Sequence, residues 1–345
     1  MFAPLTVSAV RPEGEGAVCV SFSVPEGKRE AFRHRPGQYL TLRRPGEGIR
    51  RSYSIACAPG RGLCVGIRRV PGGAFSDWAQ GLAPGDVVEV MPPEGRFVSG
   101  AEDEVLLIAA GSGVTPMVAI AAEALERGAS VTLVYGNRAS ASIMFKDALE
   151  AMKDRHMGRF HLVHVLSREM QDVALLNGRV DGPKVVELAE RRVIAPRAAD
   201  AVFLCGPGGM IDEVRGALAG LGVERDRIRF ERFGEVGAPP VARSREAAAA
   251  ASGVRVEVVL DGARRSFEIG EADGSVIDAA ERAGLELPWS CRGGMCCTCR
   301  CRVEEGTAEM AVNYSLEPWE VEAGFTLACQ TRPTSDRLVL DFDAA

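Results

Sequence analysis

Four cysteines near the carboxyl end of the chain have the types and the spacing of iron–sulfur ligands. Cys291, Cys296 and Cys299 form a C-x4-C-x2-C pattern, and Cys329 follows far downstream. This spacing is typical of plant-type [2Fe–2S] sites, in which the fourth thiolate comes from a distant part of the chain. The pair Gly293–Gly294 supplies the permissive dihedral angles that such a tight loop requires. The pattern therefore predicts a one-electron carrier.

A zinc site is the alternative interpretation of these cysteines, because closely spaced cysteines also bind zinc. Zinc sites favour two similar C-x2-C pairs, whereas here three cysteines crowd one loop and the fourth stands alone. We therefore favour the iron–sulfur cluster. Cys297 and Cys301 fall outside the pattern, and we interpret them as residues without a ligand role.

Two short motifs in the first hundred residues could bind an anionic, aromatic cofactor. In Arg51-Ser-Tyr53-Ser, the arginine could hold a pyrophosphate while the tyrosine ring lies against a flat ring system. A glycine turn at 72–73 follows, with Ser76 or Asp77 expected to cap a helix over residues 78–82. The N-terminus of a helix offers free backbone N–H groups to an anion, so both motifs together predict a phosphate site.

Two glycine turns in the middle of the chain have the position of nucleotide-binding turns. Gly111-x-Gly113-x-x-Pro116 follows an apolar run and opens a helical pattern, where a dinucleotide phosphate binds in doubly wound sheets. Cys205-Gly-Pro-Gly-Gly repeats this arrangement at an edge where a nicotinamide would lie. After the intervening run, Tyr135-Gly-Asn-Arg138 offers an arginine in place of an acidic residue, which favours a 2′-phosphate and hence NADPH.

The chain divides into stretches of different periodicity. Six short β-runs within residues 1–100 predict a small antiparallel barrel. Five strands alternating with helices over residues 101–234 predict a doubly wound parallel sheet. The Pro- and Ala-rich stretch 235–252 is expected to be a linker. Residues 253–345 predict a small mixed α+β sheet crossed by one helix, with Ser275 as its N-cap.

Composition and charge narrow the class of protein. Residues 253–345 hold 9 Lys/Arg against 17 Asp/Glu, a net charge of −8, whereas residues 1–252 carry a net charge of +2. This distribution argues against a nucleic-acid partner and suits electrostatic docking onto a basic patch. The uncharged run Val105–Ala122 is interrupted by Gly and Pro, so we expect a strand and a helix there, not a membrane span. We see no signal-peptide pattern, which predicts a cytoplasmic protein.

Together, these motifs resemble the ferredoxin–NADP reductase family fused to a C-terminal plant-type ferredoxin. The segments Ile108–Met117, Tyr135–Arg138, Asn313–Pro318 and Val339–Asp343 further resemble the reductase subunits of phenylacetyl-CoA epoxidase, a ring 1,2-epoxidase. The resemblance implies a multidomain fold: an antiparallel β-barrel that binds FAD, an α/β doubly wound NAD(P)-binding domain, and an α+β, β-grasp [2Fe–2S] ferredoxin domain.

The resemblance also implies roles for single residues. Arg51 would bind the flavin phosphates, Tyr53 would stack on the isoalloxazine and Ser54 would lie near its N5 atom. The residues implied for the pyrophosphate and nucleotide sites are Gly73, Ser76, Gly111, Gly113, Thr115, Pro116, Arg138, Cys205 and Gly206. Cys205 would border the site of hydride transfer, and Phe233 would cover the other flavin face. The implied cluster ligands are Cys291, Cys296, Cys299 and Cys329.

The implied function is electron transfer to an oxygenase. NADPH would reduce FAD, and the [2Fe–2S] cluster would carry electrons singly to the diiron oxygenase subunits that epoxidise phenylacetyl-CoA in aerobic phenylacetate degradation. The chain has no E-x-x-H carboxylate set of the kind that builds diiron sites, so we expect the oxygen chemistry on another subunit. One alternative is a reductase, with FAD or FMN, for a ring-hydroxylating dioxygenase or another monooxygenase. Another, of a different class, is a redox-sensing module without turnover.

Overall fold

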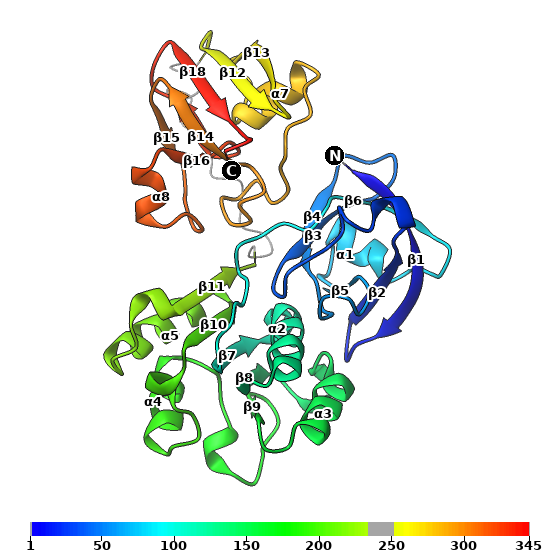
Figure 1. Ribbon diagram of the computed structural model, residues 1–345, viewed down its shortest axis with the longest axis vertical. Helices are drawn as coiled ribbons and strands as arrows, with labels where there is room; N and C mark the ends of the chain where they lie inside the picture. Colours follow the sequence, from blue (N-terminus) through cyan, green and yellow to red (C-terminus); the bar gives the residue numbers. More distant parts are fainter. Residues whose placement is uncertain (1, 234–251, 345) are drawn as a thin grey trace. The chain divides into compact units, whose positions relative to one another are not determined.

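The computed structural model describes residues 2–233 and 252–344, which fall into two compact units, Met1–Phe233 and Gly234–Ala345 (Figure 1). The predicted linker over residues 235–252 lies outside the described residues, except for Ser252. Each unit is described by itself below.

The first hundred residues form a six-stranded sheet in which every neighbouring pair of strands is antiparallel. The strand order is β4-β3-β6-β1-β2-β5. The strands are β1 (Ala3–Pro12), β2 (Ala17–Ser23), β3 (Tyr39–Arg43), β4 (Arg50–Ser54), β5 (Cys64–Arg68) and β6 (Val87–Val90), and one helix is α1 (Ala74–Ala79). Alternating apolar residues such as Leu40, Leu42 and Val65 are fully buried and form the core of this sheet.

The remainder of the first unit is a five-stranded parallel sheet of order β11-β10-β7-β8-β9. The strands are β7 (Glu104–Ala110), β8 (Ser130–Asn137), β9 (Phe160–Leu166), β10 (Ala201–Gly206) and β11 (Ile228–Arg232). The helices are α2 (Val114–Arg127), α3 (Lys146–Arg155), α4 (Gly182–Glu190) and α5 (Gly208–Gly220). The direction of strand addition reverses between β7 and β10, and ligands of doubly wound sheets bind at the carboxyl ends of the strands at such a switch point.

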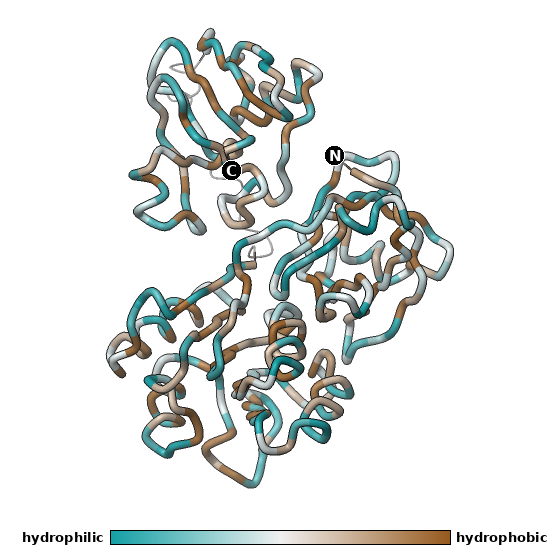
Figure 2. The backbone as a smooth tube through the Cα atoms, viewed as in Figure 1, coloured by the Kyte–Doolittle hydropathy of each residue, from teal (hydrophilic) through white to brown (hydrophobic). Residues whose placement is uncertain are grey.

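Both faces of this parallel sheet are covered by helices. Leu107 of β7 packs in a core cluster with residues of α2 and α3, whereas its neighbours Leu106 and Ile108 pack with residues of α4 and α5. A strand buried on both faces reads as a continuous apolar run, as Figure 2 shows for the central strands. The run Val105–Ala122 divides, as predicted, into β7 and α2, joined by a 3₁₀ turn at Gly111–Gly113.

The second unit contains a five-stranded mixed sheet of order β13-β12-β18-β14-β16 and a two-stranded sheet β15-β17. The strands are β12 (Arg255–Leu260), β13 (Ala263–Glu268), β14 (Arg300–Glu305), β15 (Ala308–Met310), β16 (Phe325–Leu327), β17 (Thr331–Pro333) and β18 (Arg337–Asp341). The helices are α7 (Val276–Arg282) and α8 (Pro318–Glu322). Ser275 caps α7 as predicted, because its hydroxyl accepts a hydrogen bond from the backbone N–H of Asp278.

None of the helices in residues 2–233 and 252–344 has the length and apolar character of a membrane-spanning segment.

Candidate active site and cluster loop

The end of strand β4 of the barrel meets the carboxyl edge of the parallel sheet. The Ser54 hydroxyl donates to Glu231 Oε2 at 3.4 Å, and Glu231 pairs in register with Cys205 on the neighbouring strand. Ser54 is 2% exposed and Cys205 is fully buried. The structure therefore brings together one residue of the predicted flavin motif and one residue of the predicted nucleotide motif.

Glu231 is a residue of this site that sequence reasoning missed. Part of the residue is exposed, but its carboxyl is enclosed, and this burial raises the pKa of Glu231 to about 8 against the opposing Ser54 hydrogen bond. Burial, and then the Glu231 charge, raise the pKa of the Cys205 thiol well above its usual value. A carboxyl that stays protonated near neutral pH can hold or release a proton at this edge. The signal in the sequence was an acidic residue inside the Phe230–Phe233 strand pattern.

The predicted flavin ligands Arg51 and Tyr53 share one face of β4, since they are two residues apart. Arg51 is exposed, and its guanidinium donates to the Arg50 carbonyl at 2.7 Å. The Tyr53 ring is half-buried, with its centroid 5.5 Å from that of Phe75 in α1. Burial raises the pKa of Tyr53, and the nearby charge of Arg51 opposes this shift. A cation beside an aromatic ring fits the phosphates and the ring system of FAD, and the roles of Arg51 and Tyr53 stay predictions.

Helix α1 begins earlier than predicted. The expectation that Ser76 or Asp77 caps a helix over residues 78–82 is wrong, because α1 spans Ala74–Ala79 and Gly73 is its N-cap. Both residues lie inside the helix. Phe75 and Ala79 are four residues apart and both buried, so the apolar periodicity begins with Phe75.

The glycine turn before α1 is held by Ser76. A Cβ at Gly73 would lie 2.5 Å from Ser76 Oγ and 2.9 Å from the Val70 carbonyl, so only glycine fits. Ser76 Oγ accepts from the Val70 N–H at 3.1 Å and lies 3.3 Å from the Gly73 carbonyl. Its hydroxyl thus fixes the turn, and a direct role of Ser76 at a pyrophosphate stays a prediction.

The two predicted nucleotide turns pack against each other. A Cβ at Gly113 would collide with the backbone of Cys205 and Gly206. A Cβ at Gly206 would lie 2.7 Å from Met210 Cε of α5. Gly111 has a φ of +57°, which side chains rarely adopt. The turns after β7 and β10 therefore form one backbone surface at the switch point of the sheet, which fits the close approach of a dinucleotide.

Thr115 and Pro116 lie in the first turn of α2 and are buried, so their side chains stabilise the turn. Thr115 Oγ1 donates to the Ser112 carbonyl at 2.8 Å. Arg138 follows β8 directly and is exposed, and it makes no side-chain hydrogen bond or ion pair with the described residues. Phe233 is partly buried and packs against the core cluster that contains Cys205. None of these positions contradicts the predicted roles, which stay predictions.

The four predicted cluster ligands lie in two contacting pairs. The Cys296 thiol is within hydrogen-bonding reach of Cys291, and the Cys329 thiol is within reach of Cys299. The charge of Cys291 also acts on Cys329, and that of Cys296 acts on Cys299. Two pairs of thiolates suit two irons. Among the described residues, no group of three or more His, Cys, Asp or Glu side chains is placed to hold a single metal ion.

Backbone N–H groups of the loop point at the ligand sulfurs. Gly293 and Cys296 each donate an N–H to Cys291 Sγ, at 3.3 and 3.4 Å. The hydrogen bond from the Cys296 thiol, followed by those from backbone N–H groups, lowers the pKa of Cys291 to about 6. Gln330 Nε2 donates to Cys329 Sγ at 3.6 Å. Hydrogen bonds to sulfur favour the thiolates that ligate iron and tune the potential of such clusters, so the loop fits a [2Fe–2S] group.

The two remaining cysteines of the loop have other surroundings. Cys301 is fully buried in β14, and this burial raises the pKa of its thiol. Cys297 has a φ of +59°, and its thiol donates to Ser315 Oγ at 3.0 Å.

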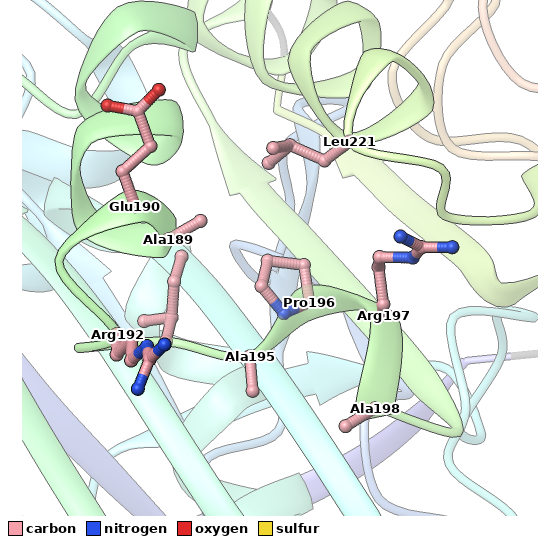
Figure 3. A pocket seen from close by; sticks show the side chains of 9 residues that line it. Ala189, Glu190, Arg192, Ala195, Pro196, Arg197, Ala198 and Leu221 are labelled. Atoms are coloured by element: carbon pink, nitrogen blue, oxygen red, sulfur yellow. The ribbon is translucent and has the colours of Figure 1, made fainter.

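A pocket of about 500 Å³ lies elsewhere in the α/β domain (Figure 3). Its lining includes Ala189, Pro196 and Leu221, which lie just before β10 or at the ends of α4 and α5. It is therefore at the amino end of the parallel strands, opposite the edge that carries the glycine turns. None of the predicted site residues lines it.

Three protein families match successive parts of the chain: the oxidoreductase FAD-binding domain over residues 7–98, the oxidoreductase NAD-binding domain over 107–216, and the 2Fe-2S iron-sulfur cluster binding domain over 258–334. The chain is 42% identical to a 1,2-phenylacetyl-CoA epoxidase component of Escherichia coli (strain K12), over 99% of this chain and 98% of the relative. The chain belongs to the family of reductase components with FAD, NAD and 2Fe–2S domains.

Other members of this reductase family are similar over the same length. The chain is 35% identical to the ferredoxin reductase component of 3-ketosteroid-9-alpha-monooxygenase of Rhodococcus rhodochrous, over 98% of this chain and 96% of the relative. The solved structure of phthalate dioxygenase reductase superimposes with a TM-score of 0.60 at 22% identity, over 99% of this chain and 98% of that chain. This last likeness shows the fold.

Family membership confirms the predicted fold class and the three redox groups. The protein is an oxidoreductase with a FAD-binding barrel, a doubly wound nucleotide domain and a [2Fe–2S] domain. FAD, when bound, supplies the step between the two-electron donor and the one-electron cluster. Family membership thus confirms that the protein uses a nicotinamide nucleotide. The predicted preference for NADPH stays a prediction.

Proposed function

We propose that this chain passes electrons from NADPH through FAD and its [2Fe–2S] cluster to the diiron oxygenase subunits of a phenylacetyl-CoA epoxidase. The observation that carries the partner is the 42% identity, across all three domains, to the epoxidase component of Escherichia coli. The acidic second unit, with a net charge of −8, suits a basic docking surface on that oxygenase.

The geometry at the carboxyl edge supports the first step of this sequence. The flavin motif ends at Ser54, and Ser54 contacts Glu231 beside Cys205, so a nicotinamide on the glycine turns and a flavin on the barrel would share this edge. Arg51 and Tyr53 would hold and orient the flavin, while the packed turns at Gly113 and Gly206 would hold the dinucleotide.

The direct experiment is turnover of phenylacetyl-CoA with NADPH, purified reductase and purified epoxidase oxygenase subunits. We expect ring epoxidation only when both components are present. Reduction of an artificial acceptor without any substrate oxidation in the reconstituted system would contradict the epoxidase assignment while leaving the reductase chemistry intact.

A second candidate function is electron transfer to a different oxygenase, because a relative at 35% identity is the reductase component of a ketosteroid monooxygenase. Reconstitution with that class of oxygenase, or with a ring-hydroxylating dioxygenase, distinguishes the candidates. The productive partner is the oxygenase with which about one molecule of product forms for each molecule of NADPH that is oxidised.

Replacing Arg138 by alanine tests the proposed preference for NADPH. If the Arg138 guanidinium binds the 2′-phosphate, the R138A variant should raise the KM for NADPH by about 10- to 100-fold and leave the KM for NADH nearly unchanged, because a charge-assisted hydrogen bond is lost for one nucleotide alone. Steady-state reduction of ferricyanide with each nucleotide measures both values. Equal effects on the two would remove Arg138 from the 2′-phosphate site.

A further inference from the structure

The loop after β8 presents both an N–H and an O–H donor at a single residue. Strand β8 ends at Asn137, Arg138 follows, and Ser140–Ser142 form a 3₁₀ turn. In doubly wound sheets this position lies beside the ribose of the nucleotide, where an acidic residue accepts from the 2′-OH or an arginine takes a 2′-phosphate. Of these two residue types, the sequence directly after β8 contains only the arginine, Arg138.

An acidic side chain reaches this loop from a distant segment. Glu169 follows β9, the neighbour of β8 in the sheet (Figure 1), and lies 29 residues beyond Ser140. The Ser140 N–H donates to Glu169 Oε2 at 2.7 Å, and the Ser140 hydroxyl donates to Glu169 Oε1 at 2.6 Å. The two segments are also joined by the Arg168 N–H, which donates to the Arg138 carbonyl at 2.8 Å. The carboxylate thus occupies both donors of Ser140.

Two arginines belong to this loop or reach it. Arg138 is exposed and its side chain is unpaired among the described residues. Arg68 reaches the same loop from β5 of the barrel, donating Nη2 to the Ser142 carbonyl at 2.7 Å, and its buried Nε has no partner among the described residues. Burial lowers the pKa of Arg68, and the positive charge of Arg138 adds to this shift against the opposing effect of Tyr135. The Ser140 hydroxyl and N–H, with a smaller effect of Lys146, lower the pKa of Glu169, so it stays ionised.

We propose that Glu169 is a specificity-determining residue for the nicotinamide nucleotide, because its carboxylate occupies the anion-binding donors of Ser140 that a 2′-phosphate would otherwise use. This inference rests on the proposed nucleotide site. A 2′-phosphate must displace Glu169 or lie against its negative charge, whereas a ribose 2′-OH can donate to it. Arg138 therefore favours NADPH, Glu169 opposes it, and the observed preference is the difference between the two.

The test compares two fragments that differ only by the 2′-phosphate. Binding of 2′,5′-ADP and of 5′-AMP to the FAD- and cluster-loaded protein is measured by titration calorimetry, without turnover. In the E169Q variant, we expect 2′,5′-ADP to bind about fivefold more tightly, because one exposed like-charge repulsion is removed. Binding of 5′-AMP should stay the same or weaken. The ratio of kcat/KM for NADPH to that for NADH should rise in parallel.

A matched control is the Glu126→Gln variant, which removes the same charge from the same unit but at an exposed site paired with Arg61. It should change neither affinity. If E169Q weakens both fragments equally, Glu169 only holds the loop in shape and the inference is overturned. If neither fragment binds the wild-type protein, the proposed nucleotide site itself is wrong, and the inference falls with it.

Discussion

The Cys329→Ser variant should lose the [2Fe–2S] absorbance and all oxygenase-coupled turnover while keeping NADPH-dependent reduction of ferricyanide within about twofold of wild type. Loss of one thiolate removes a ligand from one iron, and the flavin and nucleotide residues lie in the other compact unit. Serine has nearly the size of cysteine, so the 7% exposed site keeps its packing. Visible and electron paramagnetic resonance spectra, with both activity assays, measure the outcome.

The matched control for this experiment is Cys297→Ser. Cys297 lies in the same loop but outside the C-x4-C-x2-C pattern, and its thiol donates to Ser315 Oγ. We expect this variant to keep the cluster spectrum. A cluster that survives in C329S, or one that disappears in C297S but not in C329S, would show that the ligand set has been assigned wrongly.

The Glu231→Gln variant should slow reduction of the flavin by NADPH about 10- to 100-fold, because it removes a group that can exchange a proton beside Ser54 and Cys205. The dissociation constant for the nucleotide and the cluster spectrum should stay unchanged. Stopped-flow absorbance at the flavin band measures the rate. Ser54→Ala removes the hydrogen bond to Glu231 together with the hydroxyl that is implied near the flavin N5 atom, so it should slow the reduction as well. An unchanged rate in E231Q would show that Glu231 has no part in the transfer.

The same carboxyl predicts a pH dependence of stability in the flavin-free protein. Burial raises the pKa of Glu231 to about 8 from an ordinary value of 4.5, so between these values the folded state holds a proton that the unfolded state has lost. The contribution of Glu231 to the free energy of unfolding therefore falls as the pH rises from 4.5 to about 8, and the loss is complete above that. Thermal unfolding at about pH 5, 7 and 9 should show a smaller loss in E231Q than in wild type.

Much of the fold follows from local signals in the sequence. The uncharged run Val105–Ala122 divides into β7 and α2 as predicted, because glycines and a proline interrupt it. The start of α1 was misplaced because the polar pair Ser76–Asp77 looks like a cap, although Phe75 already faces the core. The two-stranded sheet β15–β17 was missed because three-residue strands carry too little periodicity to detect.

The candidate site was predictable only where its residues form a recurrent sequence motif. The cysteine spacing and the glycine turns are of this kind. Glu231 and Glu169 are not, because each acts on a residue far away: Glu231 on Ser54, 177 residues apart, and Glu169 on Ser140, 29 residues apart. Such contacts depend on how the sheets close and on which residues share an edge. A single sequence does not encode them in a readable pattern.

Each of the four core clusters of described residues takes its side chains from one side of residues 234–251 only. A substitution that weakens the packing around Leu107 therefore leaves the packing around Leu340 intact, and the reverse holds too. Residues 2–233 and 252–344 can consequently accumulate core substitutions independently of each other under selection. A lineage could exchange its electron-output half for one matched to a new oxygenase, and the half that draws electrons from the nucleotide would need no compensating change in its core.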